Sequence, residues 1–199
     1  MENNISEIVP IKKNKRKEFF KNVWDLIKFA TIALAIVIPI RLWIAQPFVV
    51  SGDSMFPTFH DKEYLIVDEL SYIMNKEKRG DVVVFRYPGD TSRYFIKRIV
   101  GMPNEEIVIE KGKVTIISEQ YPNGLPINEP YVREAFQTDG IYQTGNNEFF
   151  VMGDNRNRSS DSRVWGVVPK KLMIGRAYLR LVPLKEFGYL PGSLADFNK

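Results

Sequence analysis

The chain begins with a polar segment that changes abruptly into an apolar one. Residues 23–44 are nearly all apolar, and Trp24 and Trp43 stand 19 residues apart near the two ends of this stretch. In a helix this separation corresponds to roughly 28 Å, close to the ~30 Å thickness of the apolar layer of a bilayer. Indole rings are typical of the two membrane–water interfaces. The pattern predicts a single transmembrane helix at residues 23–45.

Residues 1–22 form a basic arm that predicts the orientation of this helix. Lys and Arg cluster between Lys12 and Lys21, and basic residues beside a span favour the cytoplasmic side. We therefore expect a single-pass protein of the cytoplasmic membrane, with a cytoplasmic N-terminus and the chain after Gln46 extracytoplasmic. A cleavable signal peptide is the alternative, but the apolar stretch is longer than a usual signal-peptide core and no cleavage motif of small residues follows it.

The rest of the chain predicts mainly β structure. Runs of β-branched and aromatic residues, separated by Gly, Pro, Asn and Asp, are typical of short strands joined by turns. The runs lie at residues 64–67, 81–85, 94–100, 106–109, 113–117, 149–152 and 175–182. Helix is expected only at residues 69–78, with a helical turn near residues 169–172. Strands at this spacing favour a compact antiparallel barrel or sandwich.

The strand pattern is interrupted once. Between residues 118 and 147 the periodicity fades into Pro, Gly, Asn and Gln. We therefore expect a core made of residues 46–108 and 149–183, with an inserted variable lobe at residues 109–148. Residues 184–199 carry no clear pattern and are interpreted as a C-terminal tail.

Composition excludes several kinds of site. The chain has no cysteine and one histidine, His60, which excludes disulfides, thiol catalysis and the usual catalytic zinc sets. A carboxylate-only cation site stays open, but no EF-hand spacing is present, so we expect no metal and no cofactor. Residues 1–45 hold eight Lys or Arg and four Asp or Glu, which accounts for the net charge of +4 and leaves 20 of each for the remainder. This distribution, without a phosphate-binding glycine loop, argues against nucleic acid as a partner.

Ser54 is the first candidate for chemistry. It lies in a segment rich in turn residues, 51–58, a few residues after the apolar stretch. A serine attacks a carbonyl only when a neighbouring base takes its proton. Carboxylates are weak bases for this purpose, and His60 would need a tight reversal across Pro57 to reach the hydroxyl, so lysine is the natural candidate. The alternative is a turn serine that hydrogen-bonds to its own backbone.

Lys97 is the candidate base. The strand period of two places it on the same face as Phe95 and Ile99, and apolar surroundings disfavour the charged form of an amine. A lysine that is neutral near pH 7–8 could act as a general base. Arg98, on the opposite face, stays charged and cannot replace it. The alternative is a strand lysine whose amine reaches solvent along its methylene stem.

A third polar segment, residues 153–166, follows the predicted strand at 149–152. It alternates Asp and Arg, which permits internal ion pairs, and Trp165 can hold one end against the core. Such a loop could be rigid enough to orient a neighbouring amine. The alternative is a solvated surface loop.

Taken together, these segments resemble the bacterial type I signal peptidases, which are membrane-anchored serine proteases. The resemblance is carried, in order, by the anchor and by residues 51–58, 80–85, 94–103 and 153–166. It implies a mainly β fold, with an N-terminal transmembrane helix followed by a β-barrel-like catalytic domain of the kind shared with self-cleaving repressors and carrying a small inserted β lobe. The uncovered stretch at residues 118–147 matches the variable lobe of that family.

The resemblance also implies a role for individual residues. Ser54 would be the nucleophile and Lys97 the general base, and Ser159 would hydrogen-bond to the Lys97 amine. The Ser54 backbone N–H would donate to the oxyanion, without the serine side chain that some relatives carry at the position of Gly52. The residues expected to hold the loop through ion pairs are Asp154, Arg156, Asp161 and Arg163. The residues expected to line the substrate pockets are Phe48, Val50, Met55, Phe95 and Ile96.

The family's substrates and surroundings complete the expectation. Signal-bearing pre-proteins would be cut after a small residue, beside the lipid bilayer and close to the protein export machinery. An extended substrate would add as a strand beside residues 46–50 or 93–96. Two alternatives remain: a self-cleaving repressor-type Ser–Lys peptidase, and a catalytically silent membrane-anchored β module that binds export or envelope partners. The predicted membrane span disfavours the first, and Ser54, Lys97 and Ser159 in register disfavour the second.

Overall fold

The computed structural model describes residues 15–43, 45–74, 77–134 and 136–193. Most of the predicted basic arm, Ile44 in the predicted anchor and the end of the predicted tail lie outside the described residues, as does the side chain of Trp43. Two units are distinguished, residues 1–41 and residues 42–199.

Among the described residues, the first unit contains helix α1, which continues to Trp43. Helix α1 (Lys15–Trp43) covers the segment for which the sequence predicts a membrane span. Its apolar side chains are exposed: Trp24, Phe29 and Ile32 retain 59%, 72% and 61% of their accessible surface. Within the described residues, no helix combines the length and apolar character needed to cross a membrane.

The second unit is built on an eight-stranded sheet whose neighbouring strands run antiparallel. The order is β1-β2-β11-β3-β4-β9-β10, and β12 pairs with β11. The strands are β1 (Ala45–Val49), β2 (Tyr64–Asp68), β3 (Val82–Tyr87), β4 (Asp90–Gly101), β9 (Glu148–Met152), β10 (Val168–Pro169), β11 (Met173–Val182) and β12 (Gly188–Tyr189). The prediction of a mainly β protein is confirmed.

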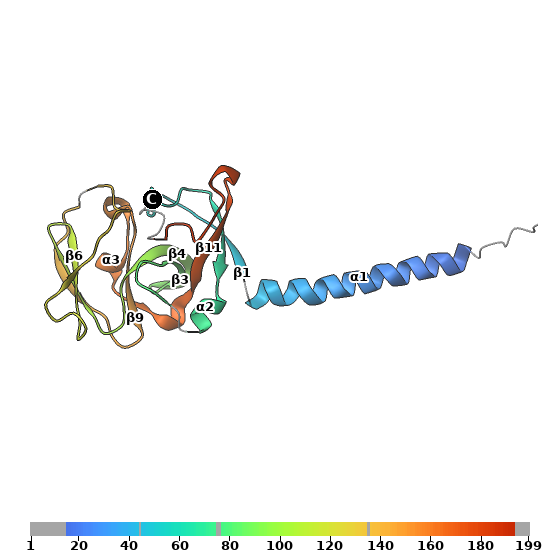
Figure 1. Cartoon of the computed structure of the whole chain (residues 1–199), viewed down its shortest axis with the longest axis horizontal. Helices are drawn as coiled ribbons and strands as arrows, with labels where there is room; N and C mark the ends of the chain where they lie inside the picture. Colours follow the sequence, from blue (N-terminus) through green and yellow to red (C-terminus); the bar gives the residue numbers. More distant parts are fainter. Residues whose placement is uncertain (1–14, 44, 75–76, 135, 194–199) are drawn as a thin grey trace, which may run out of the picture. The chain divides into compact units, whose positions relative to one another are not determined.

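A smaller sheet of four strands forms the lobe, in the order β7-β6-β5-β8. Its strands are β5 (Glu106–Glu110), β6 (Lys113–Ile117), β7 (Leu125–Pro126) and β8 (Gly140–Gln143). Figure 1 shows β6 of this sheet on the far side of β9 from β3, β4 and β11. The smaller sheet therefore begins at Glu106, shortly before the expected start of the lobe, because β5 pairs with β6 through the Lys111–Gly112 turn, where both residues have positive φ.

In the described part of the second unit, helical structure is limited to single turns. These are α2 (Leu70–Ile73), η1 (Arg156–Arg158), α3 (Ser162–Trp165), η2 (Lys170–Leu172) and η3 (Leu184–Glu186). The helix expected at residues 69–78 is therefore shorter than predicted, and residues 75–76 lie outside the described ranges. The predicted tail contains η3 and β12, and it contributes buried residues Pro191 and Gly192.

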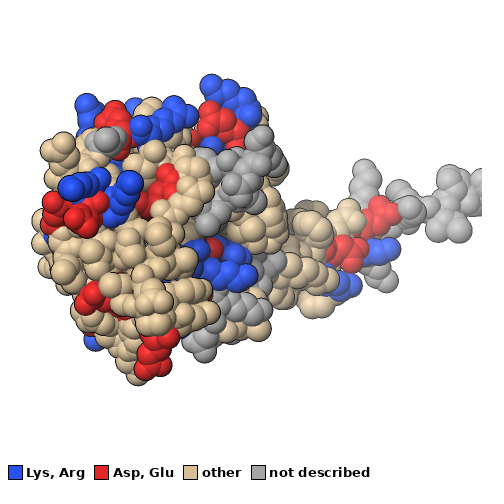
Figure 2. Space-filling view, turned by 60° about the vertical axis from the view of Figure 1, so that its left-hand side comes forward, with Lys and Arg blue, Asp and Glu red and all other residues tan. Residues whose placement is uncertain are grey.

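Charged side chains of both signs lie on one face of the second unit (Figure 2). On the face shown in Figure 2, Lys and Arg lie beside Asp and Glu in small clusters, with a broad uncharged area between them. This agrees with the equal numbers of acidic and basic residues after position 45.

One hydrophobic cluster joins the two sheets. Val100 and Phe150 of the larger sheet pack with Ile107 and Ile116 of the smaller sheet, and each of these side chains is at most 1% exposed. Burial of such side chains stabilises the fold by about 1.5–3 kcal/mol each. The lobe is therefore part of the same packed body as the larger sheet.

We predict that Phe150→Ala lowers the free energy of unfolding by about 3–5 kcal/mol, because it leaves a cavity in the cluster that joins the sheets. Urea denaturation followed by circular dichroism measures the change. The matched control is Ile141→Ala, whose side chain is 70% exposed and should change stability by less than about 0.5 kcal/mol. Equal effects of the two substitutions would contradict the assignment of Phe150 to the core.

Candidate active site

A cavity of about 360 Å³ lies between the edge of β1 and the first half of β4. Within the described ranges, β1 pairs only with β2, and residues 94–97 of β4 pair only with β3, because the pairing of β4 with β9 begins at Arg98. Both strands therefore present an unpaired edge. The cavity is lined by Phe48, Val49, Val50, Ser51, Ser54, Leu65, Val84, Arg93, Tyr94, Phe95, Ile96, Lys97 and Ser160.

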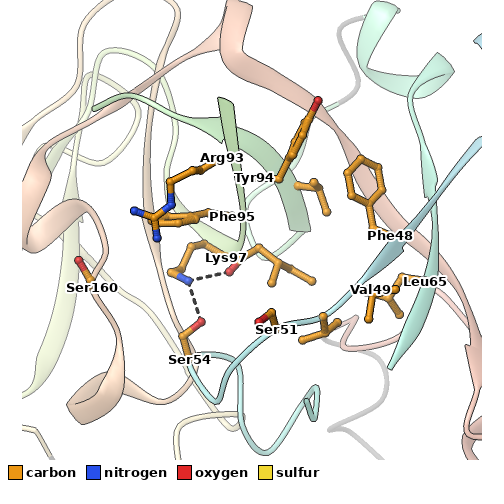
Figure 3. Close-up of a pocket in the computed structure, with 13 residues that line it drawn as sticks. Phe48, Val49, Ser51, Ser54, Leu65, Arg93, Tyr94, Phe95, Lys97 and Ser160 are labelled. Atoms are coloured by element: carbon orange, nitrogen blue, oxygen red, sulfur yellow. Dashed lines mark hydrogen bonds between the residues drawn. The ribbon is translucent and has the colours of Figure 1, made fainter. Parts of the chain in front are cut away.

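Ser54 and Lys97 meet at one end of this cavity, although 43 residues separate them in the sequence. The Lys97 Nζ donates to Ser54 Oγ at 2.7 Å and to the Ile96 carbonyl at 2.8 Å, as Figure 3 shows. Ser54 lies in a tight turn, in which the Phe56 N–H donates to the Asp53 carbonyl and Gly52 has φ +87°. The structure thus brings together the nucleophile and base candidates.

The Lys97 amine is held in an apolar environment. Lys97 is only 4% exposed, and its Nζ lies 5.4 Å from the centre of the Phe95 ring. Burial lowers the pKa of Lys97 to about 8, against the opposing effect of the negative charges of Asp161 and Asp154. A substantial fraction of this amine is therefore neutral in mildly alkaline solution and able to accept a proton.

The backbone of Ser54 is fixed by the start of the polar loop. The Asn155 N–H donates to the Ser54 carbonyl at 3.0 Å, and the Asn155 side chain donates to the Asp53 carbonyl at 3.0 Å. Gly153 makes this approach possible, because a Cβ at this position would collide with the Ser54 carbonyl and with Ser159. The Ser54 N–H has no acceptor among the described residues.

Asp154 forms a buried ion pair with Arg98, a partner that the sequence analysis did not identify. Arg98 Nε and Nη2 donate to the two carboxylate oxygens at 2.8 and 2.6 Å, and both side chains are 0% exposed. The Thr58 hydroxyl donates to the same carboxylate at 2.5 Å. The position of Arg98 on the face of β4 opposite Lys97 was the available signal, because a charge that points into a core requires a partner.

The other predicted ion-pair residues have different partners. Arg156 pairs with Glu129 of the lobe at 2.5 Å, so it joins the loop to the lobe. Asp161 and Arg163 pair with each other at 2.8 Å within the loop, and Asp161 also accepts from the Gly153 N–H at 3.0 Å. The loop is therefore held by one internal ion pair and two external ones.

The expected hydrogen bond between Ser159 and Lys97 is not formed. The Ser159 Oγ is buried and has no hydrogen-bond partner among the described residues, because the Lys97 amine donates to Ser54 and the Ile96 carbonyl instead. Ser159 packs against Gly153. Trp165, by contrast, packs as expected, with its ring centre 6.0 Å from that of Phe85.

Four of the five predicted substrate-lining residues line the cavity, namely Phe48, Val50, Phe95 and Ile96. Met55 does not: it is 1% exposed and packs in the core, because the turn after Ser54 directs its side chain inward. Tyr94 was missed, and its ring packs edge-on against Phe48 with centres 5.4 Å apart. Arg93 was also missed, although the strand period that placed Phe95 and Lys97 on one face also places Arg93 there.

Away from the cavity, His60, Glu63 and Glu186 bring three ligand atoms within 4.8 Å of one another. The Arg180 guanidinium lies 3.0 Å from the carboxylates of both Glu63 and Glu186. A positive charge is therefore already supplied to this cluster by the chain itself. We assign no metal to it.

Comparison with known proteins identifies relatives over most of the chain. Residues 23–182 match the family model described as signal peptidase, peptidase S26. A signal peptidase I from Leptolyngbya laminosa is 37% identical over 80% of this chain and 81% of its own. A probable signal peptidase I-1 from Synechocystis is 33% identical (84% and 88%), and the signal peptidase I S of Bacillus subtilis is 32% identical (83% and 92%).

A solved structure of a signal peptidase I from Enterococcus faecalis is 26% identical and covers 51% of this chain and 96% of its own, with a TM-score of 0.44. The family model alone spans more than half of the chain. The protein therefore belongs to the signal peptidase family, peptidase S26.

Proposed function

We propose that this protein removes N-terminal signal peptides from exported pre-proteins, with Ser54 as nucleophile and Lys97 as general base. The observation that carries the proposal is the 2.7 Å contact between Lys97 Nζ and Ser54 Oγ together with the burial of that lysine. Membership of the signal peptidase family supports the substrate class. A silent binding module would not need a buried lysine in contact with a serine hydroxyl.

The proposed reaction begins with the neutral Lys97 amine. It takes the proton of the Ser54 hydroxyl as Oγ attacks the carbonyl carbon of the scissile bond. The unpaired backbone N–H of Ser54 is available to stabilise the oxyanion. Lys97 then gives the proton to the leaving amine of the substrate, which completes the acyl-enzyme. The Lys97 amine, neutral again, activates a water molecule that hydrolyses the ester and releases Ser54.

The hydrogen bonds of the Lys97 amine differ from those that the family resemblance implies. Ser159 Oγ is buried beside Gly153 and finds no hydrogen-bond partner in the described part of the chain, so we assign it no hydrogen bond to Lys97 in the free enzyme. The Lys97 Nζ donates instead to the Ile96 carbonyl, at 2.8 Å. We infer that Asp154 and Asp161 act indirectly, because their ion pairs fix the loop that binds the Ser54 backbone.

Substrate selection follows from the open edges of β1 and β4. We infer that an extended peptide adds as a strand between them, with main-chain hydrogen bonds to the unpaired edges. Apolar side chains then surround the residues before the scissile bond. Large substrate side chains would clash with Phe48, Val50 and Ile96, which accounts for cleavage after small residues.

We further propose that the N-terminal segment attaches the enzyme to the cytoplasmic membrane, with the second unit on the extracytoplasmic side. The basic arm supports this orientation. The exposed apolar side chains of α1 support contact with lipid, because monomeric soluble proteins rarely leave so many large apolar groups in water. Attachment beside the export machinery would raise the effective concentration of the substrate's cleavage region.

We predict that Ser54→Ala and Lys97→Ala each reduce kcat by roughly 10³-fold or more, because each removes a group that acts in bond making. Cleavage of a signal-bearing pre-protein by the purified full chain in detergent measures the effect. Lys171→Ala, which removes an exposed lysine of η2, is the control and should retain full activity. Cleavage that persists in either active-site variant would overturn the assignment.

We predict that kcat/KM rises with pH and levels off above an apparent pKa of about 8. The direction follows because burial lowers the pKa of Lys97, so the protonated, inactive form dominates below that pH and the neutral base above it. A pH series with a short peptide substrate measures the profile. A rise that begins only above pH 10 would show that Lys97 behaves as a solvated lysine.

We predict that the full chain stays in the membrane pellet after extraction with alkaline carbonate, whereas a chain that starts at Leu42 is released. Protease added to spheroplasts whose inner membrane is intact should digest the second unit. Protection of that unit in intact spheroplasts would reverse the proposed orientation. Release of the full chain by carbonate would instead show peripheral attachment.

A further inference from the structure

The segment that follows β12 is part of the core, although the sequence pattern gave it no role. Pro191 and Gly192 are buried. The Leu190 N–H donates to the Tyr178 carbonyl of β11 at 2.7 Å, and the Ser193 N–H donates to the Leu190 carbonyl at 3.0 Å. These bonds hold the segment in a defined path.

Gly192 lies against residues that adjoin the active site in sequence, namely Arg98 next to Lys97 and Thr58 shortly after Ser54. Its carbonyl accepts from Arg98 Nη1 at 2.6 Å. A Cβ on Gly192 would collide with Thr58 and would lie 3.2 Å from the Phe59 ring and 3.4 Å from Arg98 Nη2. Its φ of +75° also lies in the left-handed region, which favours glycine. The chain therefore has little room for any other residue here.

Arg98 connects Gly192 with the segments that carry Lys97 and Ser54. Arg98 follows Lys97 in β4, and its remaining donors bind Asp154 and the Gly80 carbonyl. Asp154 in turn accepts from the hydroxyl of Thr58, four residues after Ser54. The residue after Asp154 donates its N–H to the Ser54 carbonyl at 3.0 Å. A shift of Arg98 would therefore displace β4, which carries Lys97, and the turn that carries Ser54.

We propose that the Leu190–Ser193 segment is a positioning element for the reaction, acting through the Gly192 carbonyl and Arg98 on the distance between Lys97 Nζ and Ser54 Oγ. This inference rests on the proposed function of that pair. Without the Gly192 carbonyl, a buried guanidinium N–H would lose its acceptor, and Arg98 would move to find another. Small displacements of reacting groups reduce catalysis steeply.

The test is Gly192→Ala in the purified full chain, assayed with a synthetic peptide that spans a signal-peptide cleavage site. We expect kcat to fall roughly 10- to 100-fold and KM to change less than about twofold, because the cavity that would bind the peptide is unaltered. A second variant ends at Tyr189 and so removes the segment altogether. For this variant too, kcat should fall while KM changes little.

Two glycine variants separate positioning from loss of stability. Gly112→Ala also combines positive φ with a collision, here with the Phe136 carbonyl of the lobe, so it should lower the Tm without lowering kcat well below that temperature. Gly188→Ala is the neutral control, because the nearest atom to its added Cβ, the Glu186 carbonyl oxygen, is 3.7 Å away. It should leave both quantities unchanged.

The outcomes distinguish this inference from the proposed function. If Ser54→Ala retains activity, the proposed function fails and this inference falls with it. If cleavage depends on Ser54 but folded Gly192→Ala keeps its kcat, or loses no more than Gly112→Ala, only the positioning role is overturned. If neither Gly192→Ala nor the shortened chain folds at 20 °C, the segment serves the fold itself and the positioning role is likewise rejected.

Discussion

The ion pair between Arg98 and Asp154 is the interaction on which the rest of the site depends. Both side chains are fully buried, and burial of two charges is tolerated only when nearly every donor and acceptor is satisfied. Here the guanidinium also binds the carbonyls of Gly80 and Gly192, and the carboxylate accepts from Thr58. Removal of one partner from such a pair costs about 3–5 kcal/mol, so the segments that meet at it are held together.

The ion pairs of the polar loop also bear on the pKa of Lys97. Negative charges near an amine raise its pKa, and Asp154 and Asp161 do so here. Each of these carboxylates is paired with an arginine, Arg98 or Arg163, which offsets much of its charge. Burial therefore remains the larger effect on Lys97, and its pKa falls rather than rises.

Most of the expectations that were wrong concern single side chains, although the helix expected at residues 69–78 is also shorter than predicted. Met55 was expected in the substrate pocket because the resemblance implies it, but the tight turn directs its side chain into the core. Ser159 was expected to bind Lys97, but the Ile96 carbonyl satisfies the amine instead. Residues 184–199 were interpreted only as a C-terminal tail because they carry no clear local pattern, whereas Gly192 is held by contacts with residues far away in the sequence.

The sequence by itself determined the mainly β character, the polar loop and the choice of a lysine as the candidate base for Ser54. These depend on strand periodicity, on turn residues and on the absence of cysteine and the single His60, all of which are local or compositional properties. Only the tertiary structure decided which charges pair, which side chains line the cavity and how completely Lys97 is buried. Such quantities depend on distances between segments far apart in the chain, such as the 94 residues that separate Arg98 from Gly192, and no local pattern specifies those distances.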